Sequence, residues 1–336
     1  MMQDVETKEM NSKQFFSRFG LLYFVGSVVT IGIQFLAIGL ARQFKPEWMD
    51  NGNLVMLVNY IPLILIAYPL FLFLLDKYVP KAPKIEEKKM TLGQGIVAFI
   101  MSYSILYIGN IIGTIATGII GSITGNPVQN AVIQMLDRLS VVLQLVIVVI
   151  IAPMFEELIF RKFLIDRTIR YGEGCAIAIS GIFFCLFHGN FSQGFYALGM
   201  GLFFGFIYVK TGRVRYTMFL HMAINFVGSV VAMKVVGLID VAKIQELLNA
   251  GDMDAYMQYV MDNMAGLAIY AGYVICVFIV AIVGVILFIV SRKKFRLVPV
   301  NAPIPKGERF KTIFLNPGMI LMCLVWIGMY IYSVVA

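Results

Sequence analysis

The chain has 336 residues, of which 60% are hydrophobic and 14% are charged, and its mean hydropathy is +0.85. This composition excludes a soluble globular domain and indicates a polytopic membrane protein. The formal net charge is +8. In a soluble protein such an excess would suggest nucleic-acid binding, but here the positive residues follow a topological pattern, so we expect membrane lipids and no nucleic acid as partners.

Nine apolar runs have lengths that suit membrane-crossing helices. In chain order they are Phe19–Leu40, Leu54–Leu75, Leu92–Ile123, Leu139–Phe163, Cys175–His188, Phe195–Val209, Met218–Val236, Leu267–Val290 and Met319–Val335. We therefore predict an all-α transmembrane bundle of about nine spans, with eight as the alternative. The fifth and sixth runs are short and close together, which favours a tight helical hairpin.

The positive residues predict the orientation of these helices. If the N-terminus is cytoplasmic, all but five of the 27 Lys and Arg fall in cytoplasmic segments. The five on the outer side are Arg42, Lys45, Arg138, Lys234 and Lys243. This distribution agrees with the positive-inside rule at every connection. We expect an integral protein of a bacterial cell membrane.

Changes in polarity divide the chain into four segments. Residues 1–90 form a two-helix membrane segment that ends in a basic, solvated cytoplasmic linker. Residues 91–236 form the membrane core, whose motifs lie within 139–236. Residues 237–265 form an acidic external loop, with a substrate lid as the alternative interpretation, and residues 266–336 form a C-terminal two-helix segment.

The fourth apolar run contains two adjacent carboxylates, Glu156 and Glu157, followed by Arg161. A charged group at the centre of a membrane helix costs about 2.5–3.5 kcal/mol, so such residues are normally functional. Glu157 and Arg161 are four residues apart with the acid first, which favours an ion pair within the helix. Glu156 points away from that pair and has no cation one turn distant. It is the candidate general base.

The chain has two histidines, His188 and His221, and both lie in apolar runs after the glutamates. Phe184 stands one turn before His188, where its ring could fix the imidazole, and Asn225 stands one turn after His221. Singly, either histidine could be a satisfied core residue. Together with the glutamates they are expected to converge on one water-filled cavity.

These residue types predict hydrolysis by an activated water. A neutral His188 and an ionised Glu156 could orient and deprotonate it, while His221 and Asn225 donate to the developing oxyanion. No serine stands in a Gly-x-Ser-x-Gly elbow. Zinc bound by the same glutamate and histidines is the alternative, but the chain lacks His-Glu-x-x-His. We expect no cofactor and no metal.

At these residues the sequence resembles the CPBP or CAAX-type intramembrane glutamic endopeptidases, a family that includes the CAAX prenyl protease and bacterial abortive-infection-like proteins. The motifs that carry the resemblance are Glu156-Glu157-x-x-x-Arg161, Phe184-x-x-x-His188 and His221-x-x-x-Asn225. A departure is Lys162, where relatives often have Gly. The resemblance implies that Glu156 and His188 activate water and that His221 and Asn225 stabilise the oxyanion, with Glu157, Arg161 and Phe184 in supporting roles.

The predicted function is therefore cleavage of a membrane-associated peptide or protein, lipidated or plain, near the cytoplasmic face. An alternative is a non-proteolytic scaffold, immunity or regulatory protein of the same family, which would keep the site as a polar packing core. A proton-relaying transporter is the third hypothesis, but the chain shows no two similar halves with paired broken helices.

Overall fold

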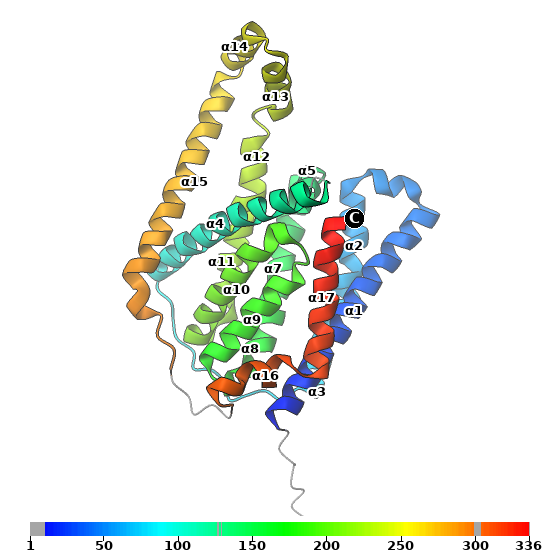
Figure 1. Cartoon of the computed structure of the whole chain (residues 1–336), viewed down its shortest axis with the longest axis vertical. Coiled ribbons are helices and arrows are strands. Elements are labelled where there is room, and N and C mark those ends of the chain that lie inside the picture. Colours follow the sequence, from blue (N-terminus) through cyan, green and yellow to red (C-terminus); the bar gives the residue numbers. More distant parts are fainter. Residues whose placement is uncertain (1–10, 126–127, 129, 299–303, 336) are drawn as a thin grey trace, which may run out of the picture.

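The computed structural model describes residues 11–335 apart from 126–127, 129 and 299–303. Over this range the chain forms helices joined by short connections, and it contains no β-strand. The predicted all-α membrane fold is therefore confirmed. The helices run side by side along most of the molecule, while α4 crosses them obliquely (Figure 1).

Among the residues that the structure describes, eight helices are long and apolar enough to cross a membrane. They are α1 (Ser12–Phe44), α2–η2–α3 (Gly52–Pro62, Leu63–Ala67, Tyr68–Tyr78), α4 (Leu92–Thr124), α6–η3–α7–η4–α8–η5 (Val141–Leu143, Gln144–Ile151, Ala152–Glu157, Leu158–Phe163, Leu164–Thr168, Ile169–Tyr171), α10 (Phe191–Thr211), α11–η6–α12 (Val214–Asn225, Phe226–Val231, Ala232–Val236), α15–η7 (Met264–Ser291, Arg292–Lys294) and α17 (Pro317–Val335). The shorter elements are η1 (Pro46–Asp50), α5 (Ala131–Asp137), α9 (Glu173–Phe187), α13 (Val241–Ala250), α14 (Met253–Asp262), η8 (Lys306–Glu308) and α16 (Arg309–Phe314).

The fifth predicted run is the 15-residue helix α9, which is shorter than the other candidate spans. It turns into α10 at Gly189, whose φ of 64° places it in the left-handed region that glycine tolerates best. Asn190 then caps α10 by accepting a hydrogen bond from the Gln193 amide. The expected tight hairpin is present, and α9 reverses the chain direction as a full span would.

The helix with the two glutamates is longer than the sequence indicated. The predicted end at Phe163 is wrong, because the helix continues through α8 and η5 to Tyr171. Charge pairing explains the extension. Lys162 bonds Asp166 one turn later at 2.6 Å, and the Arg167 guanidinium donates to the Phe163 carbonyl at 3.0 Å. These charged side chains therefore find partners one turn away on the same helix, so the helix can continue past Phe163.

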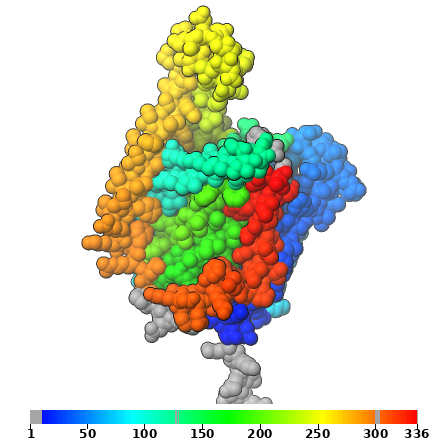
Figure 2. Space-filling view, viewed as in Figure 1, coloured from blue at the N-terminus to red at the C-terminus, as the bar shows by residue number. Residues whose placement is uncertain are grey.

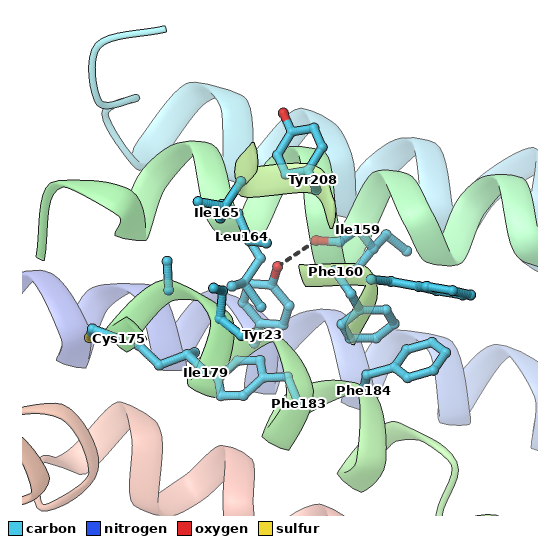
Figure 3. Packing of buried hydrophobic residues seen from close by; sticks show 14 of the residues in the cluster. Tyr23, Ile159, Phe160, Leu164, Ile165, Cys175, Ile179, Phe183, Phe184 and Tyr208 are labelled. Atoms are coloured by element: carbon cyan, nitrogen blue, oxygen red, sulfur yellow. Dashed lines mark hydrogen bonds between the residues drawn. The ribbon is translucent and has the colours of Figure 1, made fainter. Parts of the chain in front are cut away.

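Tightly packed aromatic and aliphatic side chains surround this helix (Figure 3). The Tyr23 ring of α1 contacts the Phe183 ring of α9, with centroids 4.9 Å apart. Its hydroxyl donates to the Ile159 carbonyl at 2.9 Å. Ile159 lies in a π-helical turn, here called a widened turn, in which the Leu164 amide donates to the Ile159 carbonyl five residues earlier. The N-terminal helix is thus hydrogen-bonded to the helix that carries the glutamates.

The first and last membrane helices lie against each other. At Gly20 of α1 a side chain would meet the backbone of Gly318 and Met319, so the contact requires a residue without a β-carbon. Further along, the Trp326 indole of α17 donates to the Ser27 hydroxyl at 2.9 Å. Helix α17 therefore packs on α1, while α15 packs on α4.

The linker between α3 and α4 is less free than the sequence suggested. Its lysines are exposed, but the Ala82 amide donates to the Asp166 carbonyl at 2.7 Å and the Lys88 amide to the Thr211 carbonyl at 2.9 Å. Glu87 also pairs with Arg213 at 3.2 Å. The linker backbone is therefore attached to the ends of α8 and α10.

The acidic segment 237–265 contains two helices, α13 and α14, that stand out from the bundle as a knob (Figure 2). Their N-caps are Asp240 and Asp252, whose side chains accept from the Lys243 and Ala255 amides. Helix α13 therefore begins at Val241, directly after its cap.

We predict that a reporter active only outside the cytoplasm is active when it is fused after Ala336. A reporter active only in the cytoplasm should be active when it is fused in the linker near Lys84. The reason is the concentration of Lys and Arg at one end of the bundle. Activities of a cytoplasmic and an exported reporter at both positions measure this. A cytoplasmic signal after Ala336 would contradict the predicted orientation of α17.

Candidate active site

The corrected helix length places Glu156 and His188 at the same depth. Glu156 lies about 22 Å from the Tyr171 end of its helix, at 1.5 Å per residue. His188 follows α9, which begins at Glu173, and it lies about 22 Å from that end by the same count. The two residues are therefore level with each other in the middle of the bundle.

Glu157 and Arg161 form a buried ion pair. Arg161 Nε lies 3.1 Å from Glu157 Oε2, and both side chains are fully inaccessible to solvent. The guanidinium carbon stands 4.2 Å from the Phe184 ring centroid, a cation–π distance. The other Glu157 oxygen, Oε1, lies 3.0 Å from His221 Nδ1. This carboxylate is therefore neutralised and held from two helices.

His221 lies between the two carboxylates. Because Glu157, paired with Arg161, can only accept, Nδ1 of His221 donates to it. The opposite ring nitrogen, Nε2, then faces Glu156, with its Oε2 3.7 Å away. Sequence reasoning placed His221 only beside the oxyanion and did not predict this contact.

Phe184 fixes the orientation of His188. Nδ1 of His188 lies 2.6 Å from the Phe184 carbonyl oxygen, and the two rings meet edge to face with centroids 4.7 Å apart. A carbonyl oxygen only accepts, so Nδ1 carries the proton. In the neutral imidazole Nε2 is then an acceptor that is free to bind water.

Asn225 holds the helix that carries the glutamates. Its Nδ2 donates to the Val148 carbonyl at 2.9 Å. In the widened turn η3 the Ala152 amide bonds Ile147 five residues back, and the next nitrogen, that of Pro153, has no hydrogen to offer Val148. Asn225 supplies the missing donor. Its amide has a second N–H, which this bond does not use.

One cavity of about 850 Å³ brings the four predicted catalytic side chains together. Glu156, His188, His221 and Asn225 all line it, and Phe184 forms part of the same wall. The Glu156 side chain keeps 31% of its surface exposed, while Glu157 has none. The accessible, unpaired carboxylate is therefore the one predicted to act as the base.

The sequence reasoning missed two polar residues on the same wall, Gln193 and Tyr196. Asn190 donates to Gln193 Oε1 at 2.7 Å, and Gln193 Nε2 lies 2.8 Å from the Tyr196 hydroxyl. The sequence held a signal for them: the two residues are three apart on a predicted helix, and so share one face, just after the motif with His188.

Over residues 11–335, outside the uncertain positions, no three His, Cys, Asp or Glu side chains meet in a way that could hold a metal ion. The four cysteines are unpaired thiols. The nitrogen atoms Nδ1 of His188 and of His221 are already bonded to a carbonyl and a carboxylate. Of the ring nitrogens of these two histidines, only the Nε2 atoms could therefore serve as metal ligands.

Residues 138–227, which contain all three motifs, match the family described as Type II CAAX prenyl endopeptidase Rce1-like. The Bacillus subtilis (strain 168) protein named "Putative membrane peptidase YdiL" is 27% identical over 165 residues, which cover 48% of this chain and 66%, just under two thirds, of that relative. No solved structure matches the chain. The resemblance to the CAAX-type family is confirmed, and an integral membrane protein with a protease-like core is supported.

Replacing Glu157 by Gln should lower the free energy of unfolding by about 3–5 kcal/mol, because Arg161 is left as an uncompensated buried charge. Unfolding in detergent measures this, with Glu47→Gln, an exposed carboxylate, as the control. The double variant Glu157→Gln/Arg161→Met should recover part of the loss. A Glu157→Gln protein as stable as the parent would contradict the proposed importance of the pair.

Proposed function

We propose that this protein is a CPBP-type intramembrane glutamic endopeptidase of a bacterial cell membrane. Its substrate is a membrane-associated peptide or protein, lipidated or plain. The observation that carries the proposal is the asymmetry of the two glutamates. Glu157 is neutralised by Arg161 and His221, whereas Glu156 is exposed to a cavity that His188 and Asn225 also line.

In the proposed reaction a water bound by Glu156 and by Nε2 of His188 attacks the peptide carbonyl carbon. Glu156 takes one proton of the water as the new carbon–oxygen bond forms. The same carboxyl then gives a proton to the leaving nitrogen as the carbon–nitrogen bond breaks. The products are a carboxylic acid and an amine, which ionise to a carboxylate and an ammonium, and no side chain becomes covalently attached to the substrate.

His221 and Asn225 are the proposed oxyanion donors. Glu157 accepts from Nδ1 of His221, so His221 acts as a donor in the imidazolium form, whose second proton on Nε2 is directed toward Glu156 and the cavity. The second N–H of Asn225 lies one turn further along the same wall. Donors held in place before the reaction stabilise developing charge without having to reorganise.

Glu156→Gln should lower turnover by about 10²–10⁴, the contribution typical of a general base, with little change in unfolding. Cleavage of a mixed library of lipidated and plain peptides by the purified protein measures this. Glu47→Gln, far from the cavity, is the matched control. If the parent protein cleaves none of these peptides, the non-proteolytic alternative gains support.

Asn225→Ala should lower turnover by about 10²–10³, as for other oxyanion donors, and KM should change less. Stability should fall as well, because the Val148 carbonyl loses its donor. The matched control is Ser180→Ala, which removes the 2.8 Å hydrogen bond to the Phe160 carbonyl of the same helix. Equal turnover in the two variants would show that Asn225 is only a packing residue.

Cleavage should survive thorough chelation, because the proposed base is a carboxylate and the reaction uses no metal. Activity is measured before and after phenanthroline, with addition of zinc as the second step. Activity that phenanthroline abolishes and zinc alone restores would instead support a zinc site at Glu156, His188 and His221.

A further inference from the structure

The cavity reaches one end of the bundle. Along α11 and α12 its wall is formed by His221, Asn225, Ser229, Met233 and Val236, at successive turns up to the last residue of α12. On the neighbouring helix α15 its wall comes from the first half, from Tyr270 to Val277. A second hollow shares Asp137, Met233 and Val236 with it and continues to the start of α13. A path therefore runs from Glu156 to that end.

The opposite end of the bundle is closed by packed side chains. Leu164 and Ile165 follow the glutamates on their helix and are fully buried, as are Phe204 and Tyr208 on α10. In Figure 3 Leu164, Ile165 and Tyr208 lie together. The Tyr208 hydroxyl donates to Asp166 at 2.6 Å. None of these residues lines the cavity.

The two ends differ in charge. The closed end holds the linker, the α10–α11 turn and the segment after α15, with most of the Lys and Arg. The open end holds α5 and the α13–α14 knob (Figure 1). Its carboxylates include Asp137 on the cavity wall and Asp240, Glu246, Asp252 and Asp254 on the knob. The positive-inside rule assigns the closed end to the cytoplasm.

We infer that substrates reach the site from the outer face of the membrane, and that they are exported or membrane-inserted polypeptides whose scissile bond is exposed there. This inference rests on the proposed function, and it differs from the sequence-based expectation of cleavage near the cytoplasmic face. The walls of the path are mostly aliphatic side chains and tyrosines, such as Tyr103 and Tyr107, with a few amides such as Asn110, and they suit an extended, uncharged segment. Asp137, nearer the mouth, suits a cationic flank.

Thiol labelling tests the direction of access independently of any catalysis. Met233→Cys and Asp137→Cys place thiols along the path, and Lys84→Cys is the control at the basic end. A membrane-impermeant maleimide applied to intact cells should label the first two above the parent level and leave Lys84→Cys unlabelled until the cells are permeabilised. Labelling of Lys84→Cys alone in intact cells would overturn the inference.

Cleavage from each side tests the substrate class. Membrane-impermeant peptides, with an uncharged segment next to lysines or next to glutamates, are offered to right-side-out and inside-out vesicles. Cleavage should be at least tenfold faster in right-side-out vesicles and should favour the lysine-flanked peptides. Cleavage only in inside-out vesicles would overturn the inference but leave the proposed function intact, whereas failure of cleavage in detergent would count against the proposed function itself.

Discussion

The buried ion pair between Glu157 and Arg161 is the constraint on which the rest of the site depends. Neither charge reaches water, so each requires the other and a set of oriented neighbours. Arg161 lies against the Phe184 ring of α9, and Glu157 binds His221 of α11. The pair therefore sets the positions of three helices relative to one another. It also leaves Glu156 as the carboxylate that faces the cavity.

A second constraint comes from the backbone of the same helix. Pro153 leaves the Val148 carbonyl without an amide donor, and the Ile159 carbonyl, which already accepts from the Leu164 amide, takes a second hydrogen bond. Neighbouring helices supply these donors from side chains. Asn225 bonds Val148, Tyr23 bonds Ile159 and Ser180 bonds Phe160. Widened turns flank the glutamates on both sides. The widened turns of this helix and the polar side chains of its neighbours therefore depend on each other.

The sequence predicted the helical class and most helices because apolar length and charge distribution determine them locally. It also predicted the Glu157–Arg161 pair, which depends only on spacing within one helix. It did not predict the Asn225–Val148 bond or the place of His221 between two carboxylates, because these depend on how neighbouring helices are aligned. The end at Phe163 was wrong because Lys162 and Asp166, which lie on either side of that predicted end, pair along an unbroken helix.

The contact between α1 and α17 has a consequence for the order in which the protein is assembled. Tyr23 supports the helix of the glutamates from α1, and α1 itself packs on α17, which follows all three motifs in the sequence. During translation the three motifs enter the membrane well before α17 leaves the ribosome. The candidate site is therefore completed only after α17 has been synthesised, so a chain that stops before α17 carries the motif side chains without the framework that aligns them.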